Sequence, residues 1–490
     1  MYLLGYDVGS SSIKVSLIDA LTGKLVDAAS SPEKEMEIIA KKPGWAEQNP
    51  DDWWKHLIIA TSKIKEKNAK HLKEVKAIGI SYQMHGLVLI DKNKKVLRPS
   101  IIWCDSRAVP AGEKATKKIG ARKCLRRLLN YPGNFTASKL RWVIENEPDV
   151  YKKTYKFMLP GEYVAMKMTD KTFTTISGLS EEILWDYENK CVSKEVLKAM
   201  EISEELVCEI EPTFSIHGEL TKQAAEEMGL TPGIKVSYVA GDQPNNAFSL
   251  NVLNPGEAAA TAGTSGVIFA IVDKNLYDPL CRVNIFAHVN YEKDSVRNGV
   301  MVCINGTGIL YNWLKRNVAC GTDYDKMNEL SEGINPGCDG LFVLPYGNGA
   351  ERTLQNKNTG ASFHGINFNV HKKEHLFRAV QEGIVFAMNY GFEVMKNMGV
   401  GIKKIRAGHA NMFLSPVFRE IFVNACNVPL EIFSTDGSQG AARAAGIGAG
   451  IYKSFDEAFI GLQKIKTLEP EKNMVKIYKE IYDSWKKLIC

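Results

Sequence analysis

An aspartate that follows a strand-like run is the first candidate for chemistry in this chain. The run Ile234–Val239 is rich in β-branched residues and is followed by Gly241 and Asp242. A turn at this position would present the Asp242 carboxylate to a ligand, as loops at strand ends commonly do. Asp242 is therefore a candidate site residue, and a hinge is expected close to Pro244.

Two turns of small residues indicate sites for an anion. Ala258–Ala270 has the pattern strand, turn, strand, and its turn is the run G-T-S-G. Such a turn leaves backbone N–H groups and hydroxyls free to face a phosphate. The N-terminus repeats the pattern, with Gly9–Ser12 between the strands Tyr2–Asp7 and Ile13–Ile18, which indicates a duplicated architecture. The alternative is that each turn belongs to an ordinary glycine-containing hairpin.

Polar runs also follow two further predicted strands. The run Q-M-H-G comes after Val75–Tyr82, and the run D-S-R comes after Val96–Cys104. Because ligand sites of α/β sheets lie beyond strand ends, these groups are expected to converge on one crevice. The alternative for His85 is a structural histidine whose hydrogen bonds are satisfied within the protein.

Periodicity and capping signals predict the helices. They are a helix from Pro50 capped by Asn49, Ser138–Glu147, Gly308–Asn317, Lys373–Met398 and a helix after Ser415. Ile405–Leu414 predicts a strand that breaks at Gly408. The small-residue run Gly437–Gly450 follows no predicted strand directly, so we interpret it as a tightly packed helix that lets a flat ligand or a neighbouring element approach closely.

Composition indicates a globular protein of two domains. The chain has 490 residues, of which 45% are hydrophobic and 24% charged. A net charge of +6 is weak support for a nucleic-acid partner, and none is expected. Ten cysteines without a C-x-x-C pair favour reduced thiols in the cytosol over a zinc site or disulfides. We expect neither an export leader nor a membrane span, because no leader pattern and no long apolar run is present.

The chain resembles the FGGY family of sugar kinases, in the actin/hexokinase-like ATPase superfamily, and within that family the xylulokinases. The resemblance covers nearly the full length. It is carried by Y-D-V-G-S-S-S-I-K, G-W-A-E-Q-N-P-D-D-W-W, Y-Q-M-H-G-L, I-I-W-C-D-S-R, F-T-A-S-K-L-R-W, A-G-D-Q, T-A-G-T-S-G-V and L-P-Y-G-N-G-A-E-R-T. Met84 and His85 stand where glycerol kinases have Arg and Glu, which points to a ketopentose.

The resemblance implies an α/β fold of two actin-like, ribonuclease H-like ATPase domains with a central cleft. Residues 1–243 would form the sugar-binding domain with the first phosphate loop, and residues 244–490 the domain with the second phosphate loop and the adenine pocket. It further implies a cytoplasmic enzyme that uses ATP and Mg²⁺ to phosphorylate a small sugar, D-xylulose, to D-xylulose 5-phosphate. Closure of the domains would assemble the site and exclude water. A homodimer is left open.

Carried over by position, the resemblance implies that Asp242 is the general base and that Asp7 helps to hold magnesium through water. Residues expected at the sugar are Met84, His85 and Gln243, and the wall behind them is expected from Trp103, Asp105 and Arg107. Residues expected at the phosphates are Ser10, Ser11, Ser12, Lys14, Gly263 and Thr264. Residues expected at the adenine are Gly408, His409, Ala410, Asn411, Gly440 and Ala441.

The sequence departs from the family pattern at two places. Xylulokinases usually have G-G-G-A-[KR]-S where this chain has A-G-H-A-N-M, and they have a Lys after Pro160, where this chain has Gly161. Ribulokinase, gluconokinase and fuculokinase activities stay open as alternatives, because the sequence does not place the side chains that distinguish hydroxyl epimers. A non-catalytic, nucleotide-binding sugar sensor is another alternative. An NAD-dependent oxidoreductase is excluded, because no glycine-rich turn leads from a strand into a helix with a later acidic residue.

Overall fold

The computed structural model describes residues 1–489, which fold into two compact units. Unit 1 contains Met1–Asn251, Phe286–Asn298 and Thr435–Leu462. Unit 2 contains Val252–Ile285, Gly299–Ser434 and the described residues from Gln463 onward. The chain thus contributes three segments to each unit. The domain boundary expected between residues 243 and 244 stays a prediction.

Unit 1 is built on a six-stranded sheet with the order β11-β12-β5-β1-β2-β3. The strands are β1 Tyr2–Val8, β2 Ile13–Asp19, β3 Leu25–Ser31, β5 Val75–Tyr82, β11 Phe214–Glu219 and β12 Lys235–Gly241. The first three strands form an antiparallel meander, whereas β1, β5 and β12 run parallel. The carboxyl ends of three parallel strands therefore meet at one edge of this sheet.

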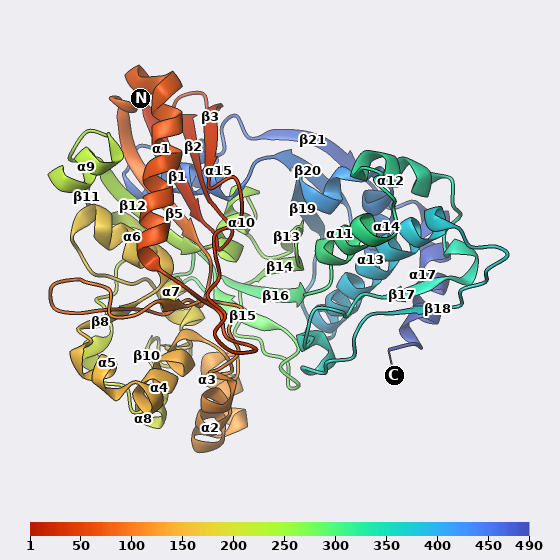
Figure 1. The fold of residues 1–490 in the computed structure, drawn as a ribbon, viewed down its shortest axis with the longest axis horizontal. Helices are drawn as coiled ribbons and strands as arrows, with labels where there is room; N and C mark the ends of the chain where they lie inside the picture. The colour runs from red at the N-terminus through yellow and green to blue at the C-terminus, as the bar shows by residue number, and fades with distance from the viewer. Residues whose placement is uncertain (490) are drawn as a thin grey trace. The chain divides into compact units, whose positions relative to one another are not determined.

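One face of this sheet is covered by a helix with large apolar side chains, and the other by a helix of small residues. Tyr6 points to one face, where its hydroxyl is 2.8 Å from that of Thr61 in the long helix α1 (Pro50–Leu72). Figure 1 shows α1 lying along β1 and β2. Asn49 caps α1 as expected, and its buried residues include Trp53 and Leu57. Large apolar side chains thus separate this helix from the strands.

The other face is covered at backbone distance by α15 (Gly437–Gly448). A Cβ atom on Gly79 would lie 2.0 Å from the carbonyl oxygen of Ala441, and one on Gly5 would lie 1.9 Å from that of Ser438. Only glycine permits this approach, because any side chain would overlap the helix backbone. The tightly packed small-residue helix is confirmed, and the element that it approaches is the sheet.

Unit 2 contains a seven-stranded sheet with the order β15-β16-β14-β13-β19-β20-β21. Its strands are β13 Glu257–Ala262, β14 Gly266–Val272, β15 Asn284–Ala287, β16 Asn298–Ile304, β19 Lys404–Gly408, β20 Leu430–Ser434 and β21 Gln463–Leu468. The order β20-β19-β13-β14 matches β12-β5-β1-β2 of unit 1, with an antiparallel hairpin beside two parallel strands in each. The duplicated architecture expected from the two small-residue turns is therefore confirmed.

The other elements surround these sheets. The remaining helices of unit 1 are α2 Val109–Ile119, α3 Ala121–Leu128, α4 Thr136–Asn146, α5 Pro148–Lys153, α6 Pro160–Thr169, α7 Ile176–Glu181, α8 Lys194–Met200, α9 Lys222–Met228, α10 Asp242–Ser249 and α16 Phe455–Ala458. Its short strands are β4 Glu47–Gln48, β6 Val88–Ile90, β7 Ser100–Ile101, β8 Lys156–Met158, β9 Trp185–Asp186 and β10 Cys191–Val192. Unit 2 adds α11 Gly308–Asn317, α12 Tyr324–Glu332, α13 Lys373–Asn397, α14 Pro416–Cys426, α17 Lys472–Lys486, β17 Phe342–Leu344 and β18 Ser362–His364.

Three local predictions are wrong. Val96–Cys104 is not one strand, because Pro99 lacks an N–H for a sheet ladder. Only Ser100–Ile101 forms a strand there, and Val96 makes an isolated bridge with Ile90. Asp242 is the first residue of helix α10 rather than part of a turn, and Pro244 is tolerated in that helix's first turn. A strand, β20, does precede α15, since it ends at Ser434.

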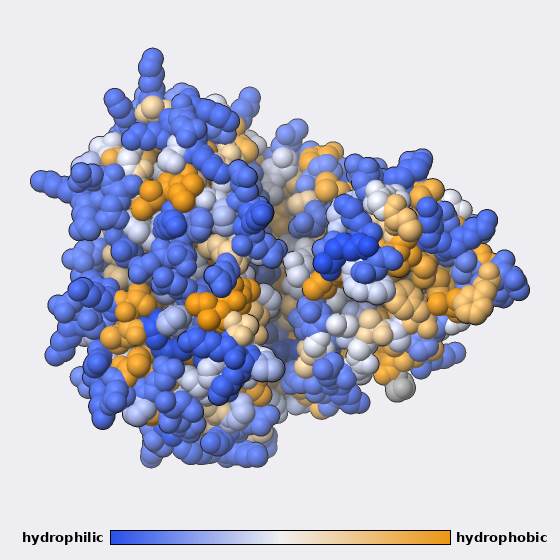
Figure 2. Space-filling model, in the orientation of Figure 1, coloured by the Kyte–Doolittle hydropathy of each residue, from blue (hydrophilic) through white to orange (hydrophobic). Residues whose placement is uncertain are grey.

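The described surface is mainly hydrophilic on the face that Figure 2 shows, where hydrophobic residues form scattered patches. None of the helices in residues 1–489 combines the length and the apolar character that a membrane crossing requires.

Because α15 packs directly on the sheet, one added methyl group at this contact should lower the stability of the protein considerably. Replacing Gly79 by Ala places a Cβ atom 2.0 Å from a backbone oxygen that cannot rotate away, so helix and sheet must separate. We expect a loss of about 1–3 kcal/mol in the free energy of unfolding, measured by chemical denaturation. Gly401→Ala is the control, because a Cβ atom there meets nothing within 4 Å. A Gly79→Ala protein as stable as wild type would contradict this packing.

Candidate active site

The carboxyl ends of the parallel strands bring three predicted site segments together. Asp7 lies near the end of β1, Met84 and His85 follow β5, and Asp242 follows β12. A Cβ atom on Gly241 would lie 2.7 Å from Cγ of Met84, so the segments after β5 and β12 touch. These three segments therefore lie at one edge of the unit 1 sheet.

Burial and neighbouring negative charges raise the pKa values of two carboxyl groups at this edge of the sheet. Burial raises the pKa of Asp242 to about 7, the charge of Asp7 acts in the same direction, and hydrogen bonds from Gln243 oppose both. Burial also raises the pKa of Asp7, to which Asp436 adds, whereas Lys14 and the Ser81 hydroxyl lower it. Asp242 is thus a carboxyl group that changes its protonation state near neutral pH.

Asp7 lies directly against the start of α15. A Cβ atom on Gly437 would be 2.9 Å from Oδ2 of Asp7 and 3.1 Å from Oδ1 of Asn246 in α10. Asp436 caps the same helix by accepting from the N–H of Gln439. Glycine at position 437 therefore leaves room for the Asp7 carboxylate beside a helix N-terminus.

The turn between β1 and β2 carries the residues expected at the phosphates. The N–H of Gly9 donates to the carbonyl of Ser12 and closes the turn. The side-chain amide of Gln48 donates to the carbonyl of Ser10 at 2.7 Å, and the indole N–H of Trp103 donates to its hydroxyl at 3.3 Å. Ser11 and Lys14 are exposed. The structure thus places Trp103 beside the first predicted phosphate loop.

Asp105 and Arg107 make their hydrogen bonds to other protein groups. The Asp105 carboxylate accepts from the guanidinium and N–H of Arg107 and from the N–H of Ala46. Arg107 also donates to Glu47 at 2.7 Å, and its guanidinium carbon lies 3.7 Å from the ring centre of Trp45. This buried arrangement fits a bracing role for both residues.

His85 is held by residues that sequence reasoning did not single out. Its N–H donates to Glu181 at 3.1 Å, its carbonyl accepts from the ammonium of Lys139 at 2.5 Å, and its ring lies 4.8 Å from that of Phe135 and 5.3 Å from that of Phe286. Lys139 belongs to the run F-T-A-S-K-L-R-W, which could have directed attention to it. Glu181 gave only a weak signal, a pair of acids in a largely apolar run.

The second predicted phosphate loop, between β13 and β14, is fixed inside unit 2. The carbonyl of Gly263 accepts from the N–H of Gly308 at 2.8 Å, at the start of α11. A Cβ atom on Gly263 would lie 3.4 Å from the side-chain nitrogen of Asn411, so this turn adjoins the segment after β19. His409, Ala410 and Asn411 are exposed there.

A cavity of about 380 Å³ lies at the start of α11. Its lining includes Gly306, Ile309, Leu310, Trp313 and Phe363. A pocket with an aromatic and aliphatic lining is typical of sites for flat apolar groups. It adjoins the second predicted phosphate loop, because Gly308 lies between two of the lining residues.

Gly440 and Ala441 lie elsewhere, in unit 1. Ala441 is fully buried, and a Cβ atom on Gly440 would lie 2.5 Å from that of Ser249 in α10. Gly408 and the segment after it belong to unit 2, so these residues and the pair Gly440 and Ala441 are in different units. Their place at the adenine stays a prediction.

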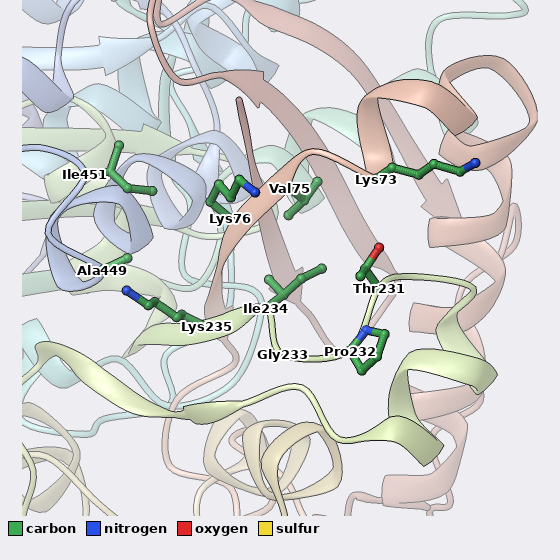
Figure 3. A pocket seen from close by; sticks show the side chains of 10 residues that line it. All are labelled: Lys73, Val75, Lys76, Thr231, Pro232, Gly233, Ile234, Lys235, Ala449 and Ile451. Atoms are coloured by element: carbon green, nitrogen blue, oxygen red, sulfur yellow. The ribbon is translucent and has the colours of Figure 1, made fainter.

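Another cavity, of about 340 Å³, lies at the opposite end of the unit 1 sheet (Figure 3). Its lining includes Val75 and Lys235, the first residues of β5 and β12, and Ala449 just after α15. The predicted site residues lie at the carboxyl ends of these strands, so this cavity is separate from them.

The family is shown by comparison of the sequence with family models. The model of the N-terminal domain of the FGGY family of carbohydrate kinases matches residues 2–249, and that of the C-terminal domain matches residues 258–449. The chain belongs to the FGGY family of carbohydrate kinases. As an FGGY kinase, it is a phosphotransferase with an alcohol group as acceptor.

Individual relatives agree with this assignment. The FGGY kinase is 30% identical to the xylulose kinase of Bacillus subtilis, over 99% of this chain and 96% of the relative. A crystal structure named as a xyloylose kinase from Brucella ovis is 27% identical and matches with a TM-score of 0.89 over 100% of this chain and 98% of that one. The gluconate kinase of Lactobacillus acidophilus shares the fold, with a TM-score of 0.87 over 99% and 97% of the chains at 23% identity. The actin-like fold of two α/β domains is therefore confirmed.

Proposed function

We propose that this FGGY kinase transfers the γ-phosphoryl group of ATP to a ketopentose, D-xylulose, and forms D-xylulose 5-phosphate. The observation that carries the proposal is the contact of Met84 with Gly241, which brings the sugar-recognition candidates Met84 and His85 beside Asp242. The relative from Bacillus subtilis, named xylulose kinase, supports the choice of sugar.

Asp242 is the general base in this proposal. Its carboxylate accepts the proton of the sugar hydroxyl while the hydroxyl oxygen bonds to the γ-phosphorus and the bond from that phosphorus to the bridging oxygen of ADP breaks. A pKa of about 7 supports the role, because such a base is largely deprotonated at working pH and still binds a proton well. The proton then passes from Asp242 to solvent.

We propose that Asp7 helps to hold the magnesium ion of MgATP. Its carboxylate interacts with those of Asp436 and Asp242, and oxygen donors that repel one another fit a hard divalent cation. Residues 1–489 contain no group of three or more His, Cys, Asp or Glu that could hold a metal ion by themselves. As the family resemblance implies, Asp7 would act through water, with the ATP phosphates as further ligands. When bound, the ion neutralises phosphate charge.

The two small-residue turns are the proposed phosphate contacts. In unit 1 the hydroxyls of Ser10 to Ser12 and the exposed ammonium of Lys14 would face the β- and γ-phosphates, and in unit 2 Gly263 and the exposed Thr264 would face the γ-phosphate. Oriented N–H groups and hydroxyls stabilise the charge that phosphoryl transfer redistributes. We assign the adenine to Gly408–Asn411, which adjoin the second turn.

The sugar would contact Met84, His85 and Gln243, with the exposed Trp103 at the side of the first phosphate loop. Asp105 and Arg107 would brace this wall through the buried hydrogen bonds that they make to each other. Because a protein named gluconate kinase shares this fold, an aldonate is the first alternative acceptor to test.

The first functional prediction concerns the acceptor. Among pentuloses, hexuloses, polyols and aldonates, D-xylulose should give the highest kcat/KM, measured as ADP release with MgATP. A site that hydrogen-bonds sugar hydroxyls discriminates strongly between analogues, so a preference for ribulose, glycerol or gluconate of about tenfold or more would contradict the choice of sugar. Nucleotide binding without ADP release for any sugar would instead favour a sensor.

The second functional prediction concerns Asp242→Asn. The amide keeps the size and the first helical position of α10 but cannot accept the proton, so kcat should fall about 10²- to 10⁴-fold. That loss corresponds to roughly 3–5.5 kcal/mol of barrier. The KM for ATP and the thermal midpoint should hardly change.

Asp91→Asn is the matched control for Asp242→Asn. Asp91 also follows a strand and caps its own turn by accepting from the N–H of Asn93, a bond that Asn can keep. Its substitution should leave kcat within about twofold, as surface changes usually do. An Asp242→Asn enzyme that retains more than about a tenth of wild-type kcat would indicate that Asp242 only caps α10.

The third functional prediction concerns pH. Since the pKa of Asp242 is raised to about 7, the carboxyl is protonated below that pH and cannot act as a base. The kcat/KM for the sugar should therefore rise about tenfold per pH unit up to pH 7 and level off above it. The residual activity of Asp242→Asn should lack this rise. A profile of the wild-type enzyme that is flat from pH 5.5 to 8 would contradict the assignment.

A further inference from the structure

His85 has a backbone conformation that residues other than glycine adopt uncommonly. Its φ angle is 61°, in the left-handed region, where the Cβ atom of an ordinary side chain is crowded by the backbone. Such conformations persist when surrounding contacts hold them, and they concentrate at functional sites. The contacts of His85 therefore show what holds a sugar-recognition candidate in place.

Glu181 holds His85 at two points. Oε2 of its side chain accepts the N–H of His85 at 3.1 Å, and its backbone carbonyl lies 2.9 Å from Nδ1 of the ring. A carbonyl can only accept a hydrogen bond, so Nδ1 carries the proton and the lone pair of a neutral ring is on Nε2. Glu181 thus fixes both the backbone and the ring tautomer of His85.

Glu181 is itself fixed by the ends of two neighbouring strands. Its Oε1 accepts the hydroxyl of Tyr82, the last residue of β5, at 2.6 Å. A Cβ atom on Gly241, at the end of β12, would lie 2.8 Å from the same oxygen. The side chain is about 1% exposed. A buried carboxyl group therefore lies between the segment of His85 and the end of β12, directly before Asp242.

On the basis of the proposed function, we propose that Glu181 is a positioning residue that holds His85 in the geometry needed for sugar binding. Lys139 completes the arrangement from the other side, because its buried ammonium donates to the carbonyl of His85. Both backbone groups of His85 are bonded to buried side chains, and Nδ1 of its ring is bonded to the carbonyl of Glu181, so backbone and ring are held in one geometry. Glu181 then controls sugar affinity without touching the sugar.

The alternative is that Glu181 only supports the fold. Removal of any buried, hydrogen-bonded carboxyl group can lower stability, so a loss of stability does not distinguish the two roles. A positioning role instead predicts a change in the KM for the sugar that depends on His85, while the KM for ATP stays the same.

The test uses three substitutions of buried acids in the full-length enzyme. Glu181→Leu removes both side-chain contacts and should raise the KM for the sugar at least about tenfold, with kcat reduced less. Glu181→Gln keeps an oxygen that can accept from His85 and should stay within about threefold of wild type. Glu182→Leu is the matched control, because Glu182 is the adjacent acid and is buried to a similar degree, and it should leave the sugar KM within about threefold.

A double-mutant cycle identifies the route of the effect. If Glu181 acts through His85, Glu181→Leu should change the sugar KM less than about threefold in a His85→Ala background, because coupled residues are not additive. An equal effect in both backgrounds, or a lowered thermal midpoint with an unchanged sugar KM, would overturn the inference. A wild-type enzyme that phosphorylates no sugar would contradict the proposed function instead, so the two failures are distinguishable.

Discussion

The approach of α15 to the sheet of unit 1 sets the position of the acidic site. Because Gly5 and Gly79 have no side chains, the helix backbone rests on the strands themselves. A hydrogen bond of 2.8 Å between the hydroxyls of Ser16 and Ser438 fixes the helix along its axis. The first residue of the helix, Gly437, then lies against the carboxylate of Asp7. A bulkier strand residue would displace this helix end, and with it one wall of the site.

Two aspartates of unit 1, Asp105 and Asp242, show how the surroundings of a carboxyl group change its properties. Asp105 is neutralised by an ion pair with Arg107 at 2.6 Å and receives an N–H from Ala46, so its charge is stabilised in place. Asp242 experiences burial and the like charge of Asp7, and its pKa rises to about 7. The Asp105 carboxylate is thus occupied by its ion pair and hydrogen bonds, whereas the environment of Asp242 increases the basicity of that carboxylate.

Local patterns allowed much of the fold to be predicted. The hairpins with small-residue turns, α11, and the helix that starts after Ser415 follow from alternation, periodicity and capping, which involve residues close in sequence. The pairing of strands across a sheet is harder to predict from local patterns. In Val96–Cys104, Pro99 interrupts a run that otherwise resembles a strand. For β20 the sequence signal was missed, since Glu431 interrupts a short apolar run and is held by Arg406 of the adjacent strand β19.

The candidate site was predicted less evenly, for a physical reason. Residues such as Asp7 and Asp242 stand directly at strand ends, where the residue type and the strand pattern together indicate a function. The contacts of His85 come from α4 and α7, far along the chain, and nothing in the sequence near Lys139 or Glu181 states that these charges are buried. Such long-range hydrogen bonds become visible only when the strands and helices are placed in space.

The residues proposed for phosphoryl transfer and the residue proposed for sugar binding are therefore positioned in different ways. The backbone of the parallel strands β1 and β12 positions Asp7 and Asp242, and the same strand arrangement recurs in unit 2, so these positions follow from the architecture itself. His85 instead depends on side chains of Glu181 and Lys139, which the architecture does not require. Under the proposed function, substitutions at these two residues would therefore alter how the sugar is held while the strands keep the carboxylates in place. In a fold shared by kinases of different sugars, such supporting side chains offer a physical route by which acceptor preference changes without loss of phosphoryl transfer.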